Sequence, residues 1–172
     1  MAAVEIFTLI RDVLRTIPLN PQDSNGEALF EAVELWKNRR IGQAMQKLII
    51  TKKRVCLVVP TNIRRDVRDT SAGLSVLGTK YAEVSLVFSD VAYFKPEQAV
   101  TFGTDVNLGL FGFDEAMEAA LTGRELSPFG GIICGDTGPV VLADSEAKDA
   151  AGREAWMMDL LVPIGLVAAS VR

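Results

Sequence analysis

The chain has 172 residues, of which 49% are apolar, and it carries a formal net charge of −4. This length and apolar content suffice for one sizeable core, so we expect residues 1–172 to form a single domain. No apolar run reaches 18 residues, and the N-terminus lacks the pattern of a signal peptide. The sequence therefore predicts a cytoplasmic protein without membrane contact.

The N-terminal segment predicts a helix over residues 4–17, because its large apolar residues fall on one stripe at helical spacing. These residues are Ile6, Ile10, Val13, Leu14 and Ile17. Two prolines end this helix, and the composition of residues 19–26 predicts a loop. Residues 29–36 suit either a helix or a strand, and their β-branched and aromatic content favours a strand.

The middle of the chain predicts a helix, two strands and a long loop. Residues 41–50 carry apolar side chains at positions i, i+3, i+4, i+7 and i+8, the pattern of an amphipathic helix. Residues 54–60 form a β-branched run closed by a proline, which indicates a buried strand. Residues 61–78 are rich in charge and glycine, so we expect a mobile loop or arm that orders against a partner. Residues 81–94 predict a long strand with a break near Ser89.

The C-terminal part predicts a short helix and a hairpin. Irregular chain over residues 95–112 leads into a helix over residues 114–121, with Asp114 as its N-cap and Gly123 just past its end. The cluster Gly-Asp-Thr-Gly-Pro at residues 135–139 lies between two apolar runs. Such a cluster indicates the turn of a hairpin.

The last predicted element is a strand over residues 153–166, in which two faces alternate. One face is apolar and consists of Trp156, Met158, Leu160, Val162 and Ile164. Pro163 lacks a backbone donor, so we expect that end of the strand to lie at an edge or outside the sheet. Together the elements predict an α+β fold, a single mixed, mainly antiparallel sheet packed by two or three helices, with one long mobile loop.

Basic residues concentrate between Lys37 and Arg68. This segment has ten basic residues and one acid, a charge of +9, which leaves −13 on the rest of the chain. Such a segment suits a surface that meets DNA without sequence preference or an acidic protein face. The alternative is a solvated face that nearby acids neutralise in the fold. No aromatic residue interleaves with the basic ones, so base stacking by this segment is not expected.

The sequence predicts no catalytic, cofactor or metal site. It has no histidine, and Cys56 and Cys134 lie in apolar runs that are typical of buried thiols. The tripeptide Asp-Thr-Gly of aspartic proteases occurs once, at residues 136–138 inside the predicted turn, so we expect Asp136 to shape that turn. Carboxylates such as Asp144 with Glu146 more often belong to a solvated loop than to a cation site.

The order of these elements resembles the tail-terminator and tail-completion (neck) proteins of long-tailed bacteriophages. Members of that group are small α/β proteins that share this succession of helices and strands. The corresponding segments here are residues 4–17, 41–50, 54–60, 81–94, 114–121, 130–143 and 153–166. The likeness covers nearly the whole chain, and the chain departs from the pattern at residues 61–78 and 102–113.

The resemblance implies a virion structural protein that is not an enzyme. Such proteins form a ring, commonly a hexamer, at the head-proximal end of the tail tube. The ring ends tube polymerisation and joins the tail to the head, so its partners are the tube protein and a head-completion or connector protein. The protein would reside in the host cytoplasm during assembly and then in the tail or neck of the virion. The alternatives are another tail or baseplate subunit, and a cytoplasmic homo-oligomeric binding domain or enzyme with an unrecognised pocket.

A ring subunit needs two different, complementary lateral faces, because head-to-tail contacts must close on themselves. The basic segment and the acidic C-terminal half could form such a pair. The last strand also has apolar residues on both faces, more than one small core needs. We therefore predict that the ring closes through an interface that includes Arg64, Arg65, Arg68, Trp156, Met158 and Leu160.

Overall fold

The computed structural model describes residues 2–20, 22–23, 25–37, 40–49, 52, 54–68, 76–89, 109–134, 140–141 and 156–169. In this part of the chain the helices are α1 (Ala2–Arg15), α2 (Ile41–Ile49) and α4 (Gly109–Leu121). The strands are β1 (Ala32–Leu35), β2 (Val55–Arg68), β3 (Val76–Ser89), β4 (Ile133–Cys134), β5 (Val140–Val141) and β6 (Trp156–Ala169). The predicted helices over residues 4–17 and 41–50 and the strand within residues 29–36 are confirmed.

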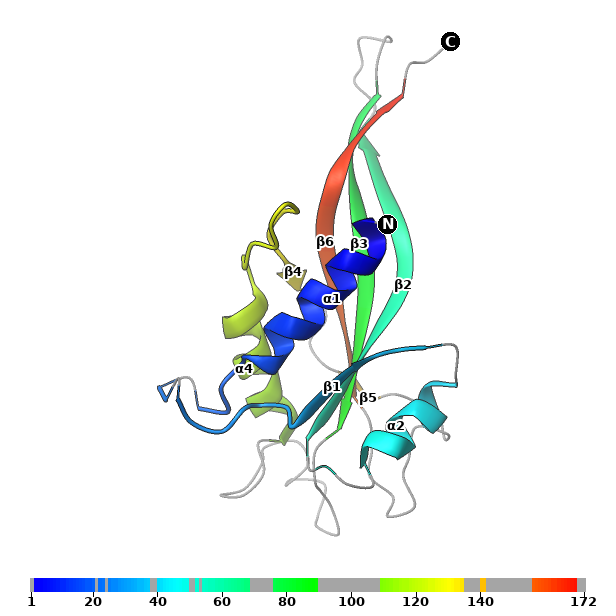
Figure 1. Ribbon diagram of the computed structural model, residues 1–172. Helices are drawn as coiled ribbons and strands as arrows, with labels where there is room; N and C mark the ends of the chain where they lie inside the picture. Colours follow the sequence, from blue (N-terminus) through cyan, green and yellow to red (C-terminus); the bar gives the residue numbers. More distant parts are fainter. Residues whose placement is uncertain are drawn as a thin grey trace.

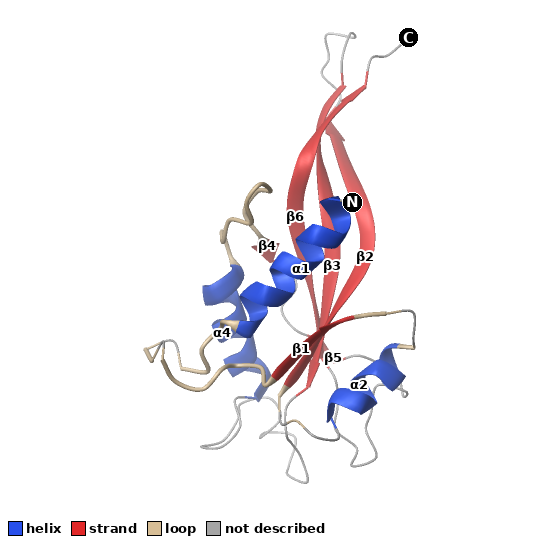
Figure 2. Ribbon diagram, in the orientation of Figure 1, coloured by secondary structure: helices blue, strands red, loops and turns tan. Residues whose placement is uncertain are grey.

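The described strands form one mixed sheet with helices packed against it (Figures 1 and 2). The strand order is β1-β2-β3-β6-β4, and β5 pairs with β6. Strand β1 runs parallel to β2, and every other pair is antiparallel. The predicted α+β fold with a single, mainly antiparallel sheet is therefore confirmed.

Helices α1 and α4 supply the core on one face of the sheet. The α1 stripe of Ile6, Ile10 and Leu14 is buried because these residues recur on the side of the helix that meets the sheet. Helix α4 contributes Met117 and Leu121 to the same core. The predicted apolar face of β6 completes it, with Trp156, Met158, Leu160 and Val162 all buried.

An aromatic cluster lies at the centre of this core. Phe88 and Phe113 have ring centroids 5.2 Å apart, and Trp156 lies 5.6 Å from Phe113 and 5.8 Å from Phe88. Phe30 stacks on Phe113 at 5.8 Å. The four rings come from separate segments of the chain, so the cluster joins the N-terminal, central and C-terminal parts.

Helix α2 contributes a second, smaller core on the opposite face of the sheet. Met45 is fully buried there with Val55, Leu57 and Val87. Alternation along β2 explains this arrangement, because Cys56 and Val58 point to the first core while Val55, Leu57 and Val59 point to the second. The start of β2 is consequently apolar on both faces.

The expectation of a loop over residues 61–78 is wrong for the part that the structure describes. Strand β2 continues to Arg68, and β3 already begins at Val76; residues 69–75 lie outside the described residues. The register joins Ile63 to Ala82 and Val67 to Gly78. Backbone pairing is satisfied by the neighbouring strand whatever the side chains are, so the charged residues remain hydrated without ending the strand.

The predicted hairpin around residues 135–139 is also wrong. Both β4 and β5 are antiparallel to β6, so they run in the same direction and do not pair with each other. Ile133 pairs with Leu161, and Val140 pairs with Met157 farther along the same strand. Both short strands, β4 and β5, form their backbone pairs with β6. The turn itself and Asp136 lie outside the described residues.

Helix α4 begins at Gly109 and not at Asp114, so Asp114 is not its N-cap. The apolar residues ahead of Asp114 continue the helix because Phe113 reaches the aromatic cluster. The end of the helix agrees with the prediction, because Gly123 has a positive φ of 73° one residue after Thr122. Only glycine adopts this conformation without steric penalty.

Strand β6 continues past Pro163 with a bulge. Tyr81 pairs with Pro163 and Lys80 with Gly165, so Ile164 is an extra residue opposite β3. On the other side of β6, the pairing with β4 stops at Leu161. Pro163 thus lies at an edge of the sheet, as its missing donor predicts.

Candidate protein interface

The outer halves of β2, β3 and β6 form a three-stranded arm that extends beyond the helices (Figure 1). Strand β1 pairs with β2 only over Val55–Val58. In the described part of the chain, the outer part of β2 and the end of β6 after Leu161 have no further strand beside them. Unpaired strand edges of this kind are templates for pairing with another chain.

The arm separates the predicted basic residues. Arg64 and Arg65 are both exposed, but as neighbours in a strand they point to opposite faces. Arg65 pairs across the ladder with Lys80, and Arg64 with Tyr81. Arg68 ends β2, where its backbone pairs with Leu77. The predicted interface residues of β2 therefore belong to two surfaces and not to one.

The remaining predicted interface residues are in the core. Trp156 is 1% exposed, Met158 3% and Leu160 0%. Together with Phe88 and Val84 they form the wall on which α1 and α4 pack. Their alternating pattern was interpreted correctly as an apolar face, but that face is covered by the chain itself. These three residues are not available to a partner of the folded subunit.

The basic segment 37–68 is dispersed in the structure. Arg54 is buried, where its Nη2 pairs with Glu27 Oε1 and its Nε donates to the carbonyl oxygen of Leu29 at 2.8 Å. Lys47 is an exposed residue of α2, in another part of the molecule from Arg65 on the arm. The charge of this segment therefore does not form one continuous patch over the described residues.

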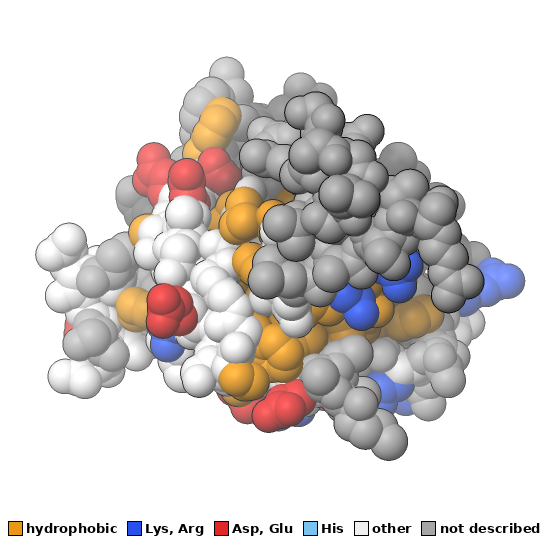
Figure 3. Space-filling view, turned by 90° about the horizontal axis from the view of Figure 1, so that it is seen from above, with side chains coloured by type: hydrophobic (Ala, Val, Ile, Leu, Met, Phe, Trp, Pro, Cys, Tyr) orange, Lys and Arg blue, Asp and Glu red, His pale blue; other side chains and the backbone are white. Residues whose placement is uncertain are grey.

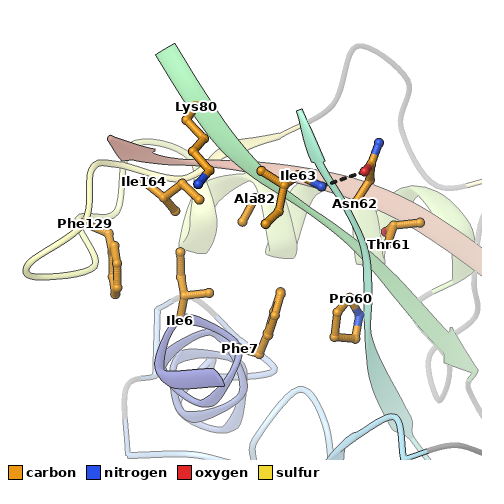
Figure 4. Close-up of a pocket in the computed structure, with 10 residues that line it drawn as sticks. All are labelled: Ile6, Phe7, Pro60, Thr61, Asn62, Ile63, Lys80, Ala82, Phe129 and Ile164. Carbon is orange, nitrogen blue, oxygen red and sulfur yellow. Dashed lines mark hydrogen bonds between the residues drawn. The ribbon is translucent and has the colours of Figure 1, made fainter. Parts of the chain in front are cut away.

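A groove of about 460 Å³ lies between α1 and the arm (Figure 4). Its lining residues come from α1, β2, β3, β6 and the loop before β4, and they are Ile6, Phe7, Pro60, Thr61, Asn62, Ile63, Lys80, Ala82, Phe129 and Ile164. The side chain of Lys80 extends into the groove beside Ile164 and above Ile6 (Figure 4). A space-filling view along the arm shows a band of apolar side chains with Lys and Arg beside it (Figure 3).

Each wall of the groove has a local structural cause. Phe7 follows Ile6 on α1 and widens the apolar stripe toward the arm. Phe129 is brought to the groove because the N–H of Gly130 donates to the carbonyl oxygen of Pro163 at 3.1 Å. Gly130 permits this approach, since a Cβ there would lie 3.0 Å from the Cβ of Pro163. The sequence pattern does not identify these residues as a site, although Ile63 is a signal, because it is an apolar residue within a charged strand.

The face of the sheet opposite the groove is polar where α2 no longer covers it. Ser85 Oγ donates to Asp159 Oδ1 at 2.6 Å, and Thr61 Oγ1 lies 3.2 Å from Ser85 Oγ. Thr61 is the extra residue of a bulge in β2, since Pro60 pairs with Val84 and Asn62 with Glu83. These hydrogen bonds join three strands at the base of the arm and hold the bulge in place.

Helix α4 presents an acidic, partly apolar surface to solvent. Glu115 and Glu118 are exposed, Asp114 is half-buried, and Phe111 is 53% exposed. These residues are three, four and seven positions from Phe111, so they lie on neighbouring parts of one helix surface. Neither the first nor the last turn of α4 carries a basic residue. The acidic surface of α4 therefore has the opposite charge to the Arg65 and Lys80 side of the arm.

Two cysteines have raised thiol pKa values. Burial in the core raises the pKa of Cys56 far above its ordinary value. Partial burial raises the pKa of Cys134, and the carboxylates of Glu118 and Asp114 raise it further, while the hydroxyl of Thr122, which donates to Cys134 Sγ at 3.3 Å, opposes them. Neither thiol is activated as a nucleophile.

Over the described residues, no three side chains of His, Cys, Asp or Glu gather as ligands for a metal ion. Asp136, Asp144 and Glu146 lie outside these residues. None of the described helices combines the length and the hydropathy that a membrane crossing requires. No protein-family model matches the chain, and a search of curated proteins gives no match.

Proposed function

We propose that this chain is a structural protein of a long-tailed bacteriophage that forms a ring at the head-proximal end of the tail tube. There it ends tube polymerisation and joins the tail to the head. Its partners are other copies of itself, the tube protein and a head-completion or connector protein. It acts by contact and not by catalysis, in the host cytoplasm during assembly and then in the virion.

The observation that carries this proposal is the three-stranded arm. An isolated domain gains little from strands that extend beyond its helices, because their side chains remain in water. The arm offers a β2 edge on one side and a β6 edge on the other. These edges differ in sequence, so a contact between them is head-to-tail, and such contacts close into a ring when the rotation per subunit divides a full turn.

The succession of elements adds support. An N-terminal helix, a helix before a strand, a long central strand, a further helix and a final long strand follow one another as in the tail-terminator and neck proteins that the sequence resembles, whereas β2 is longer than in that pattern and β4 and β5 do not form its hairpin. A tube or baseplate subunit would use the same head-to-tail logic. The two roles differ in one respect, because a terminator caps the tube and a tube subunit extends it.

Electron microscopy of the purified protein, alone and with tail tubes of the same virion, tests the proposal. We expect rings with rotational symmetry, either in solution or bound at one end of each tube. Binding at one end with arrest of tube growth supports a terminator, whereas incorporation along the tube supports a tube subunit. A protein that remains monomeric up to about 100 µM and does not bind tubes contradicts both.

A further inference from the structure

We propose that the groove between α1 and the arm binds the acidic surface of α4 from a second copy of this chain, with Phe111 inserted in the groove. This inference rests on the proposed function, since it names the surfaces through which neighbouring copies meet. It does not use Trp156, Met158 or Leu160, which the core already covers.

The receiving surface is mainly apolar, with Lys80 inside it and Arg65 beside it. Ile6, Ala82 and Ile164 line the interior, and its volume of about 460 Å³ is in the range of about 300–1,000 Å³ at which protein pockets hold large ligand groups. Lys80 extends into it (Figure 4), and Arg65 is the cross-strand neighbour of Lys80 on the same face. Ile63 at the rim is 47% exposed, an unusual place for a large aliphatic side chain on a charged strand.

The inserted surface has the complementary pattern. Phe111 is the most exposed of the large apolar residues in the described part of the chain. Aromatic side chains that enter a pocket are the usual anchors of protein interfaces. Glu115 lies one helical turn from Phe111 and Glu118 two turns, so both carboxylates accompany the ring at its approach to Lys80 and Arg65. Opposite charges around an apolar contact set its orientation and exclude the reverse arrangement.

The two surfaces lie on different parts of the subunit. The groove lies between α1 and the arm, whereas α4 lies beside β4, to which Thr122 at its end is linked through Cys134. A copy that offers α4 to its neighbour on one side therefore keeps its own groove open to the next copy. The contact is head-to-tail and propagates.

The two surfaces also lie at different positions along the strands. Phe113 of α4 packs on Phe88, whereas the groove lies at Ala82, six residues or about 20 Å away along β3.

Heterotypic disulfide trapping tests the contact. In a Cys134→Ser background, a chain with Ile63→Cys is mixed with a chain with Phe111→Cys, oxidised, and resolved on a non-reducing gel. We expect a cross-linked dimer in the mixture and little in either chain alone. Arg64→Cys is the matched control, because this neighbour of Ile63 points to the opposite face. Equal yields from Ile63→Cys and Arg64→Cys would overturn the proposal.

Charge reversal provides the second measurement. Lys80→Glu should weaken self-association by about tenfold, and Glu115→Lys in the partner chain should restore it. If rings form normally, no cross-link appears and Lys80→Glu has no effect, this interface is wrong and the ring proposal remains. A chain that neither self-associates nor binds tubes would overturn both. A third outcome is that the protein binds dodecanoate, that Lys80→Gln abolishes this binding, and that no cross-link forms. The groove would then be a site for an anionic amphiphile and not for a second copy.

Discussion

The two halves of the long strands differ in what covers them. At the inner half, Cys56 and Val58 face the core under α1 and α4, while Val55 and Leu57 face the core under α2. At the outer half, residues 61–66 are all exposed. The same strand β2 passes from one environment to the other at the bulge of Thr61.

This difference shows that strand pairing and burial are separate requirements. The outer half pairs over its full described length with β3, and β3 with β6, although few of its side chains are buried. Backbone hydrogen bonds fix the geometry of the arm, and the inner core supplies most of the stability. Substitutions of exposed side chains on the arm should therefore lower the stability of the fold only slightly.

The largest expected effect is at the aromatic cluster. Phe88→Ala should lower the free energy of unfolding by about 3–5 kcal/mol, because it removes a fully buried ring and leaves a cavity among Phe30, Phe113 and Trp156. Urea denaturation followed by tryptophan fluorescence measures it. Ile63→Ala on the arm is the matched control and should change stability by less than about 1 kcal/mol. Similar losses in both variants would contradict the division between core and arm.

The next prediction compares Arg54, which immediately precedes β2, with Arg65 within β2. Arg54→Ala should destabilise the fold by about 1.5–3 kcal/mol, because buried Arg54 holds Glu27 and the carbonyl oxygen of Leu29. Arg65→Ala, at an exposed position, should stay within about 0.5 kcal/mol. Thermal and urea denaturation of the two variants provide the measurement. A larger loss for Arg65 than for Arg54 would show that the arm has a structural role in the isolated subunit.

A smaller effect is expected where α4 turns back toward β4. Gly123→Ala should cost about 1 kcal/mol, because an L-residue is strained at a φ of 73°. A Cβ at this position would have no atom within 4 Å, so the penalty comes from the backbone alone. Gly123→Asn should be milder, since asparagine tolerates this conformation better. Equal losses for the two variants would point to a cause other than backbone strain.

The smallest effect concerns the thiols. Because burial and the carboxylates of Glu118 and Asp114 raise the pKa of Cys134, its alkylation by iodoacetamide should reach half-maximal rate at a pH above that of a free thiol. Glu118→Gln should move this midpoint to lower pH. Buried Cys56 should not react until the protein unfolds. Mass spectrometry of the alkylated sites distinguishes the two, and rapid labelling of Cys56 in the native protein would contradict the described core.

The sequence predicts the buried elements well, because a helix or strand with one buried face has apolar residues at regular spacing. The stripe of Ile6, Ile10 and Leu14 and the alternation of β6 identify their elements and the core face of each. The arm could not be predicted in this way, since the outer half of β2 has little to bury. Its charges indicated a loop, whereas pairing with β3 and β6 makes it a strand.

The candidate interface was predictable only in part for a related reason. Apolar alternation in Trp156, Met158 and Leu160 does not say whether α1 and α4 or another molecule covers them. The groove is lined by Phe7, Lys80 and other residues that are far apart in the chain, so no local sequence pattern shows that they lie together. Ile63 and Phe111 lie outside the periodic stripes, which is the signal that exposed apolar residues leave in a sequence.

The position of β6 has a consequence for synthesis of the chain. This last strand lies inside the sheet, between β3 and the short strands β4 and β5, and its first residue follows the end of β3 by 67 positions. At about 5–20 residues per second, a ribosome needs about 3–13 s to cover that distance. During this interval β3 has no partner on one side, and Leu86 and Phe88 lack their contacts with β6. A nascent chain therefore cannot complete the three-stranded arm until β6 has been made.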